Sequence, residues 1–388
     1  MRDKQTTTSP VLIIATSLVS GLSHLSLIIG KYLANDDDGF FISHQMFISK
    51  LYDTILNKTE NTVPLYEHFF HINNPFVRDN QQVETSTENN LKRKRKRPKY
   101  EEDDTSKKIK TFISNLKSQD IFSTSPRFLD NNICARHASI KFYENTSELK
   151  TFFGQNPNPN LHIANGYVFP PKSQFYCDNV FNMKNLKDEK YDIILLDPPW
   201  TNKYIKRKKK IKRDEGYTMM VDQDLAQLPI NEFLTSNGLV CVWCTNSQNH
   251  IDTLKSVLFP KWNIKYVACW YWIKVTKCGE FICNFAPQTG KQPYERIIFG
   301  RKIDSDTKIK NPEENKLIAS VPSSVHSHKP PLSEILVPYL PPTPKCLELF
   351  ARYLLPNWTS YGLEALKFQH QFLYENSDIE HCNHKSNI

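Results

Sequence analysis

The sequence predicts an α/β fold built on a mostly parallel sheet, with an accessory region at the amino terminus. Strand-like stretches alternate with helical stretches over residues 170–372, and this alternation is typical of a parallel sheet with right-handed crossovers. One stretch, residues 191–196, is an Ile/Leu run followed by two prolines, which indicates a strand covered on both faces. Ligands of open α/β sheets bind at the carboxyl edge, so the residues that follow this run are the first candidates for a site.

The individual elements follow from hydrophobic periodicity and length. Apolar runs of strand length predict strands, and apolar residues at helical spacing predict helices. The expected strands lie at residues 193–196, 239–242, 266–273, 295–299 and 346–349. The expected helices lie near residues 225–233, 248–258, 332–340 and 364–372, with a helical stretch at 109–116 and an Asn/Pro-rich turn at 156–160.

The chain has 388 residues, enough for about two to three domains. Changes in composition suggest where it divides, because a polar stretch of opposed charges cannot bury enough apolar surface to become ordered. We expect a partly helical accessory region at 1–80, a disordered charged linker at 81–110, an accessory segment at 111–169, the α/β domain at 170–372 and a flexible tail at 373–388.

Residues 11–30 contain no charged side chain and follow Arg2 and Lys4, which superficially resembles a signal sequence or a membrane span. Serine, threonine and histidine interrupt this stretch throughout. Apolar residues recur in it at helical spacing, namely Leu18, Leu22, Leu25 and Ile29. We favour an amphipathic helix over a membrane anchor and expect no membrane partner.

Two short tracts carry most of the basicity behind the net charge of +9. Lys92–Lys99 holds seven positive residues within the polar linker, and Lys203–Arg213 holds eight. A dense Lys/Arg run is the composition that nuclear import receptors read, and the alternative is a solvated tract that contacts nucleic acid nonspecifically. We favour an import receptor as the partner of Lys92–Lys99 and expect the nucleus as the location, with the cytosol left open.

Glycine and cysteine usage disfavours several kinds of site. Only 11 glycines occur and no Gly-x-Gly pair, which excludes a P-loop and a dinucleotide-binding glycine loop. Nine cysteines lack an extracellular spacing pattern, so we expect free thiols in a reducing compartment. Cys241 and Cys244 have zinc-knuckle spacing, but strand residues three apart point to opposite faces. Because Cys278, Cys283 and the tail around Cys382 are equally weak candidates, we expect no metal.

The tetrapeptide Asp197-Pro198-Pro199-Trp200 follows the predicted strand directly and suits one kind of chemistry. The exocyclic amine of adenine is a poor nucleophile because its lone pair is delocalised into the ring. A carboxylate that accepts one N–H, and a fixed backbone carbonyl that accepts the other, would free this lone pair. Proline restricts the backbone, and tryptophan offers a face to a purine. The alternative is a strand end and a Pro-Pro turn with Trp200 as a core cap.

Four motifs in order support the chemical interpretation: Asp197–Trp200, His326–Pro331, Leu347–Arg352 and Pro356–Trp358. Over about residues 170–372 the chain resembles the MT-A70 family of adenine-N6 methyltransferases. Finer details are similar to the branch of methyltransferase-like protein four, at Pro170–Ser173, Lys316–Pro322 and Lys367–His370. The resemblance implies a Rossmann-like domain that uses S-adenosyl-L-methionine (S-adenosylmethionine), with the catalytic motif ahead of the cofactor loop.

The resemblance also implies a role for each matching position. Asp197 would accept from the adenine amine and face the cofactor, the Pro198 carbonyl would take the second N–H, and Pro199 completes the rigid turn. Trp200 would pack the target base, beside Tyr217. The implied cofactor contacts are Asp178 near the adenine of the cofactor, Lys329 on its methionyl carboxylate, and Phe350, Arg352 and Glu364 on its ribose side.

Two departures and one basic tract bear on how well the site works. Leu363 and Tyr353 stand where the branch usually has asparagine. The loss of two polar contacts on the ribose side of the cofactor could weaken cofactor affinity by roughly 1 kcal/mol each if they are buried hydrogen bonds. The tract that follows the catalytic loop could hold phosphates of a flipped or single-stranded target, and the alternative is a solvated loop. Within this tract, Lys203–Arg213, the candidate contacts are Lys206, Arg207, Lys208, Lys209 and Lys210.

Residues and resemblance together predict a nuclear N6-adenine methyltransferase that acts on nucleic acid. The branch points to a 2′-O-methylated adenosine in U2 small nuclear RNA, with deoxyadenosine in DNA as the close alternative. A nucleic-acid-binding scaffold with a vestigial cofactor pocket is the alternative from another class. A monomer is compatible with the sequence, which leaves open whether a partner subunit is required.

Overall fold

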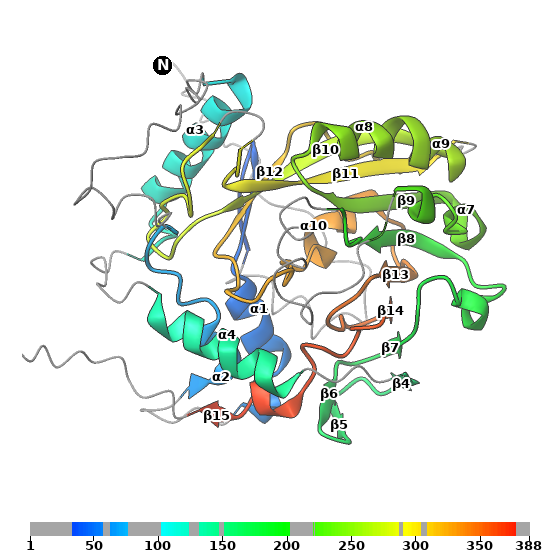
Figure 1. The fold of residues 1–388 in the computed structure, drawn as a ribbon, viewed down its shortest axis with the longest axis horizontal. Coiled ribbons are helices and arrows are strands. Elements are labelled where there is room, and N and C mark those ends of the chain that lie inside the picture. The colour runs from blue at the N-terminus through cyan, green and yellow to red at the C-terminus, as the bar shows by residue number, and fades with distance from the viewer. Residues whose placement is uncertain are drawn as a thin grey trace, which may run out of the picture.

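The computed structural model describes residues 33–56, 63–76, 102–123, 132–146, 151–201, 220, 222–286, 290–303 and 309–377. Within them, an 11-stranded mixed sheet has the order β1-β2-β12-β10-β11-β9-β8-β13-β14-β7-β4 (Figure 1). Its strands are β1 (Leu33–Asp36), β2 (Gly39–Ile42), β4 (Phe153–Asn156), β7 (Ser173–Tyr176), β8 (Tyr191–Leu196), β9 (Leu234–Cys244), β10 (Ile264–Lys274), β11 (Tyr294–Lys302), β12 (Leu317–Ser320), β13 (Cys346–Leu349) and β14 (Trp358–Tyr361). Two small sheets pair β3 (Val63–Pro64) with β15 (Asn376–Ser377) and β5 (His162–Ala164) with β6 (Tyr167–Phe169).

The helices are mostly short. The α-helices are α1 (His44–Leu51), α2 (Leu65–His68), α3 (Asp104–Ser118), α4 (Ile133–Asn145), α6 (Asp222–Leu225), α7 (Ile230–Phe233), α8 (Gln248–Thr253), α9 (Phe259–Lys261) and α10 (Ser333–Leu336). The π-helical turn η4 (Leu254–Leu258) joins α8 to α9. Single 3-10 turns are η1 (Asp53–Ile55), η3 (Met183–Leu186), η5 (Val337–Tyr339) and η6 (Gln371–Leu373).

Both faces of the sheet are covered, as the apolar run at residues 191–196 predicted. Ile193 and Leu195 of β8 pack in one hydrophobic cluster, and Ile194 and Leu196 pack in a second. Helices α1, α2 and α4 contribute to the first cluster, and α3, α8 and α9 contribute to the second (Figure 1). Successive apolar side chains of β8 point to opposite faces, so hydrophobic core lies on both sides of the sheet.

The expected α/β fold with a mostly parallel sheet is confirmed, with a reversal at β11. β8 pairs in parallel with β9 and β13, and β14 pairs in parallel with β13 and β7. β11 runs antiparallel to both β10 and β9. The described residues between β10 and β11 contain no helix, so the chain returns directly beside β10 instead of crossing over the sheet.

The five expected strands lie within β8, β9, β10, β11 and β13, but the helix expected at residues 364–372 is wrong. These residues form turns that lead into η6. Leu366 packs in a small cluster with Phe175, whereas Phe368 packs in the cluster of Ile193. Because the apolar side chains serve two clusters on different sides, they do not form one helical face.

Part of the segment expected to be a disordered charged linker, residues 81–110, is helical instead. Helix α3 begins at Asp104, and the side chain of Asp103 caps it by accepting from the backbone N–H of Ser106 at 2.8 Å. The acidic block that suggested disorder therefore includes a helix start, where a carboxylate satisfies a free N–H and complements the helix dipole. The basic tract Lys92–Lys99 and the stretch 11–30 lie outside the described residues.

The sheet itself does not stop at residue 170, the expected start of the α/β domain. β2 pairs in parallel with β12, and β4 pairs antiparallel with β7. Parts of both expected accessory segments are thus strands of the same sheet, since their backbone groups complete the ladders at its two sides. Removal of residues 33–42 or 153–156 from the sheet would therefore leave the backbone groups of β12 or β7 without their strand partners.

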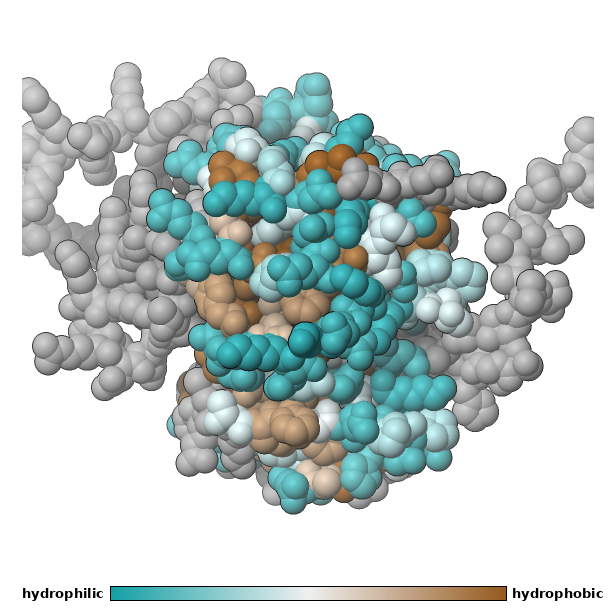
Figure 2. Space-filling view, turned by 90° about the vertical axis from the view of Figure 1, so that its right-hand side faces the viewer, coloured by the Kyte–Doolittle hydropathy of each residue, from teal (hydrophilic) through white to brown (hydrophobic). Residues whose placement is uncertain are grey.

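The face shown in Figure 2 is mostly hydrophilic, with separate hydrophobic patches. Such a mixture is ordinary for a protein surface in contact with water. Within the described ranges, no helix combines the length and apolar character that a bilayer span requires.

Gly39 lies where β2 approaches β12 too closely for a side chain, because a Cβ there would lie 2.0 Å from the carbonyl oxygen of Leu317. We expect Gly39→Ala to lower the free energy of unfolding by roughly 2 kcal/mol, since the two backbones must separate. Urea denaturation measures this change. The control Asp37→Ala, in the exposed neighbouring turn, should change the same free energy by less than about 0.5 kcal/mol. An unchanged value for Gly39→Ala would contradict the pairing of β2 with β12.

Candidate active site

The carboxyl ends of four neighbouring strands bring predicted site residues to one edge of the sheet. β8, β13, β14 and β7 lie side by side and run in the same direction. Asp197 directly follows β8, Phe350 and Arg352 follow β13, Glu364 follows β14, and Asp178 follows β7. The parallel order thus collects residues that are up to 186 positions apart in the sequence, as predicted for an open α/β sheet.

Backbone hydrogen bonds tie these strand ends together. The N–H of Asp197 donates to the carbonyl of Leu349 at 3.3 Å, and that of Ala351 donates to Tyr361 at 3.1 Å. The N–H of Gly362 donates to Tyr176 at 3.0 Å. Each strand end is therefore bonded to the next, which makes the edge a rigid base for the side chains above it.

The turn after β13 is strained, and it needs a glycine beside it. Phe350 has a φ of 61°, in the left-handed region that bulky residues rarely adopt. A Cβ on Gly362 would lie 2.9 Å from the backbone nitrogen of Ala351. The absence of a side chain at Gly362 lets β14 approach this turn, and strained turns of this kind are common where a site must be shaped.

Asp197 lies between two cations. Its Oδ2 accepts from Nη1 of Arg352 at 2.6 Å, and its Oδ1 lies 3.6 Å from Nζ of Lys329. Both carboxylate and guanidinium are about one-tenth exposed or less. Lys329 follows β12, which runs in the same direction as β8, so it reaches the same edge from the other half of the sheet. Three residues that the sequence singled out are therefore in contact.

A second acid holds Lys329 from the other side. Nζ of Lys329 donates to Oε2 of Glu295 at 2.6 Å, and Lys274 forms an ion pair with the other oxygen of Glu295. Burial acts to raise the pKa of the Glu295 carboxyl, but the two lysines outweigh burial and hold that pKa far below its ordinary value. Burial likewise opposes the charge on Lys329, but Asp197 and Glu295 raise its pKa above the ordinary value.

The charge network continues beyond Arg352. Nε of Arg352 donates to Oε2 of Glu364 at 3.1 Å, and Nζ of Lys367 donates to Oε1 of Glu364 at 2.5 Å. Burial acts to raise the pKa of the Glu364 carboxyl, but Lys367 and Arg352 lower it below its ordinary value. Positive and negative side chains thus alternate along the edge, which is how buried charges are stabilised. In order they are Lys274, Glu295, Lys329, Asp197, Arg352, Glu364 and Lys367.

Sequence reasoning missed Lys274 and Glu295. Lys274 ends β10, and Glu295 is the second residue of β11, so the antiparallel pair brings both to the site edge. A charged residue at either end of an otherwise apolar strand is the signal that could have identified them. This signal points to the site only once β11 is known to run antiparallel to its neighbours, because that direction places Glu295 at the same edge as Lys274.

Asp178 lies on the same edge but outside this network. Its Oδ1 accepts from the backbone N–H of Asn179 at 2.6 Å and from the side chain of Asn182 at 3.2 Å. Its Oδ2 accepts from the hydroxyl of Tyr361 at 3.4 Å. Asp178 is therefore fixed by local contacts at the end of β7, two strands away from β13.

Trp200 is more buried than its expected role requires. Its indole N–H donates to the carbonyl of Trp243 at 2.7 Å, and its ring stacks on His250 with centroids 5.1 Å apart. The ring is 7% exposed and belongs to the core. One ring face is therefore taken by His250, and the alternative interpretation as a core cap describes Trp200 in this structure. His250, which also lies 3.3 Å from the hydroxyl of Thr201, was not singled out from the sequence.

The two prolines fix the backbone next to Asp197. The carbonyl of Pro198 accepts from the N–H of Trp200 at 2.8 Å, and that of Pro199 accepts from Met220 at 3.2 Å. A carbonyl oxygen has two lone pairs, so Pro198 keeps one acceptor position for another donor. Thr201 and Met220 flank the segment with Tyr217 and the basic residues Lys206–Lys210, which lies outside the described residues.

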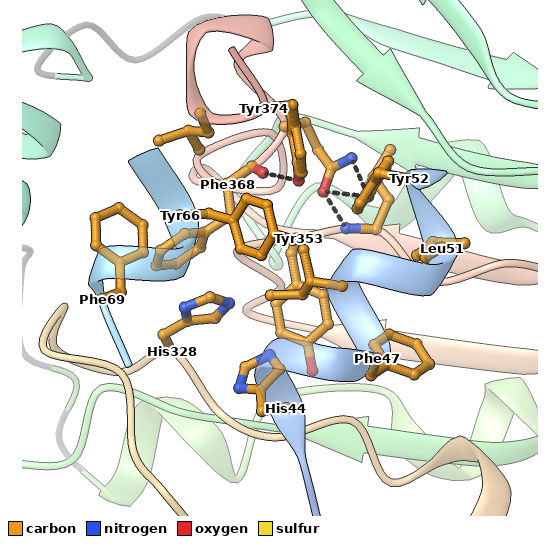
Figure 3. A pocket seen from close by; sticks show the side chains of 14 residues that line it. His44, Phe47, Leu51, Tyr52, Tyr66, Phe69, His328, Tyr353, Phe368 and Tyr374 are labelled. Carbon is orange, nitrogen blue, oxygen red and sulfur yellow. Dashed lines mark hydrogen bonds between the residues drawn. The ribbon is translucent and has the colours of Figure 1, made fainter. Parts of the chain in front are cut away.

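The two departures from the family pattern lie in different surroundings. Leu363 is 47% exposed at the end of β14. Tyr353 is buried and lines a cavity with His44 and His328 behind the charged edge (Figure 3). The position of Tyr353 does not match the expected ribose-side contact, because its neighbours are the rings of this cavity.

The cysteine pair of β9 has the geometry that strand alternation predicts. Cys241 packs in the cluster of Ile193, whereas Cys244 packs in the cluster of Ile194 on the opposite face. The eight cysteines in the described part of the chain are thiols and not disulfides. That part contains no group of three or more His, Cys, Asp or Glu residues arranged to hold a metal ion.

Comparisons with known proteins bear on the family that the chain resembles. Residues 191–364 match the family model described as MT-A70. The Mus musculus protein named N(6)-adenine-specific methyltransferase METTL4 is 40% identical over 214 residues, which are 53% of this chain and 44% of the relative. A DNA N6-methyl methyltransferase of Caenorhabditis elegans is 36% identical over 211 residues, 54% of this chain and 55% of the relative.

A third relative is named for RNA. The N6-methyladenosine RNA methyltransferase MTA1 of Cryphonectria parasitica is 34% identical over 219 residues, 55% of this chain and 62% of the relative. The chain thus spans about half the length of the curated relatives it matches. The resemblance to the MT-A70 family, and to the branch that was singled out, is confirmed by these matches.

A further acid, Glu348, lies beneath the site in β13. It is 4% exposed, and its Oε2 has no hydrogen-bond partner among the described residues. Burial, with a smaller contribution from Asp197, raises the pKa of its carboxyl to about 8, although Arg352 acts in the opposite direction. Glu348 is therefore protonated in the folded protein at neutral pH.

We expect the contribution of Glu348 to stability to fall as pH rises from 4.5 to about 8, because the unfolded chain releases the Glu348 proton more readily than the folded chain does. Glu348→Gln has a similar shape and no charge. The variant should match the wild type near pH 4.5 and exceed its free energy of unfolding by roughly 4 kcal/mol above pH 8, because folding raises the pKa of the Glu348 carboxyl from 4.5 to about 8. Urea denaturation across this range measures the difference. A difference that does not change with pH would contradict the buried, protonated carboxyl.

Proposed function

Residues 191–364 match the MT-A70 family model, and from this match we propose that the chain is an S-adenosylmethionine-dependent N6-adenine methyltransferase that acts on nucleic acid. One observation carries the proposal: the carboxylate of Asp197 lies at the carboxyl edge, 2.6 Å from Arg352 and 3.6 Å from Lys329. This carboxylate directly precedes the two prolines whose carbonyls are fixed by backbone hydrogen bonds. The fixed carboxylate of Asp197 and the fixed carbonyl of Pro198 are two hydrogen-bond acceptors, which suits an amine that carries two N–H bonds.

The chain's own groups would act on adenine by accepting hydrogen bonds. Asp197 takes one amine N–H, since a carboxylate has about four acceptor positions and Arg352 uses one of them. The free lone pair of the Pro198 carbonyl takes the other. Both acceptors are fixed before the base arrives, so little reorganisation is needed as the nitrogen becomes nucleophilic. Arg352 and Lys329 hold Asp197 in place and counter its charge.

The residues of the edge fit the cofactor that the family implies. S-adenosylmethionine, when bound, supplies an electrophilic methyl group on a sulfonium. Lys329 is a buried cation that would hold a carboxylate, and Glu364 is an acid that would accept from ribose hydroxyls. Asp178 at the end of β7 would accept from the cofactor's adenine amine. In this structure Lys329 contacts Glu295, so a bound carboxylate must share the lysine with that acid.

The finer substrate is also a proposal. One relative is named for DNA and another for RNA, so both classes of nucleic acid are candidates. We favour a single-stranded RNA that carries a 2′-O-methylated adenosine, as in U2 small nuclear RNA, and keep deoxyadenosine as the alternative. A catalytically inactive scaffold is supported by one observation, which is that Lys329 is already paired on two sides. Calorimetry with S-adenosylmethionine separates the two, because an inactive pocket would release no heat.

We expect the purified chain to transfer a labelled methyl group to oligonucleotides with a single adenine. Asp197→Asn should lower kcat by about 1,000-fold, since the uncharged amide oxygen is a weaker acceptor for the amine than the carboxylate and the amide NH2 group cannot accept at all. Matched RNA, 2′-O-methylated RNA and DNA oligonucleotides identify the substrate class. Mass spectrometry of the nucleosides places the methyl group. Circular dichroism checks that the variant is folded.

The matched control is Asp252→Asn, which makes the same chemical change on the exposed side of α8 and should keep wild-type kcat. If neither RNA nor DNA is labelled by the wild type, or if Asp197→Asn retains wild-type kcat, the proposed function is wrong.

We further propose that Lys92–Lys99 directs the chain into the nucleus, which its density of positive charge supports. A fluorescent fusion should accumulate in nuclei. Replacement of Lys94, Arg95 and Lys96 by alanine should abolish this accumulation, and the same replacement of Lys208, Lys209 and Lys210 should not. Equal distribution of both variants would contradict the assignment.

A further inference from the structure

Helix α1 packs against the back of the charged edge. Its buried residues are His44, Phe47 and Ile48. This helix lies outside the segment 191–364 that matches the family model. Nevertheless it lines one cavity together with His328 and Tyr353, the chain neighbours of Lys329 and Arg352 (Figure 3).

The amino-terminal end of α1 supports the loop that carries Lys329. The rings of His44 and His328 pack edge-on, with centroids 4.4 Å apart. His328 also stacks on Phe368 with centroids 3.8 Å apart. Because His328 is held between these rings and directly precedes Lys329, the backbone from which Lys329 extends is fixed from behind.

The carboxyl-terminal end of α1 supports the segment that carries Arg352. Tyr52 follows the helix, and its hydroxyl accepts from Nε2 of Gln369 at 2.9 Å. Oε1 of the same Gln369 accepts from the backbone N–H of Leu354 at 3.1 Å. Leu354 is two residues beyond Arg352, and Gln369 is fully buried. These hydrogen bonds join Tyr52, at the end of α1, to the turn after β13, and Figure 3 marks hydrogen bonding at Tyr52 by dashed lines.

The contacts are packing and hydrogen bonds between uncharged groups. Burial lowers the pKa of His44 to about 3 and that of His328 well below its ordinary value. Both rings are therefore neutral at neutral pH, and they can pack without repelling each other. The cavity of about 20 Å³ between the rings has room for about one water molecule, so the helix has little space to shift.

We propose that α1 is a positioning element of the active site, whose two ends hold the two segments that supply the cations around Asp197. The proposal rests on the proposed function, because it assigns the helix to methyl transfer at the same site. It gives a catalytic purpose to an amino-terminal segment that sequence reasoning left without a role. The helix itself touches neither Asp197 nor its two cations in the contacts described above.

The test uses the full chain and substitutions at both ends of α1. His44→Ala removes the ring, His44→Phe keeps a ring of similar size, and Tyr52→Phe removes only the hydroxyl. The control is Met46→Ala, on the exposed side of the same helix. Two readouts are measured: kcat with KM for the oligonucleotide, and hydrogen exchange in peptides that cover residues 326–329 and 350–354.

We expect His44→Ala and Tyr52→Phe each to lower kcat by about ten-fold, because small displacements of catalytic groups are costly, and to change KM for the oligonucleotide by less than about two-fold. His44→Phe should restore most of kcat, since it restores the ring packing. Exchange should become faster in the two named segments and stay unchanged in β8. Met46→Ala should match the wild type in both readouts.

Wild-type kcat and wild-type exchange in both His44→Ala and Tyr52→Phe would overturn the proposal. A loss of activity accompanied by faster exchange throughout β8 would also overturn it, because that pattern indicates general destabilisation. If the unsubstituted chain transfers no methyl group, the proposed function fails separately. The exchange measurements then still decide whether α1 holds the two segments.

Discussion

The carboxylate of Asp197 lies between two cations that reach it from different halves of the sheet. Arg352 comes from the turn after β13, and Lys329 comes from the loop after β12. A buried carboxylate is stable only when it is paired, and each of these cations is in turn paired with a further acid, Glu364 or Glu295. The rest of the site depends on this alternation of positive and negative side chains, because the loss of one charge leaves the neighbouring charges uncompensated. The strand order, the backbone bonds at the strand ends and the support from α1 all serve to keep these groups in contact.

How much of the fold could be predicted from the sequence depended on the length and burial of each element. The strand at 191–196 was predictable because it is apolar on both faces, and β13 was predicted with its observed bounds. β14 and β7 have four residues each, too few for a recognisable period, and they were missed. The helix expected at 364–372 was wrong because its apolar residues pack on two sides. β1 and β2 lie far from their partners in the sequence, and only tertiary contacts show that they extend the same sheet.

The site was predictable where a residue belongs to a motif that follows a strand. Asp197, Lys329, Arg352 and Glu364 were expected at one edge, and the structure brings them into one network. Glu295 could not be placed, because its contribution depends on the reversed direction of β11. The residues that pack behind the charged edge could not be predicted either, since in the sequence a buried ring such as His44 cannot be told from any other core residue. The assigned roles of the site residues in catalysis and cofactor binding stay predictions.

The central claim is that Asp197, held by Arg352 and Lys329, receives the amine of the target adenine. A crystal structure of the chain with S-adenosylhomocysteine and an adenine-containing oligonucleotide would test this most directly, through the distances from the adenine N6 atom to its neighbours. We predict that N6 lies within hydrogen-bond distance of an Asp197 carboxylate oxygen and of the Pro198 carbonyl, with Arg352 still paired to the acid. A base bound elsewhere, or an Asp197 that contacts only its two cations while N6 faces other groups, would contradict it.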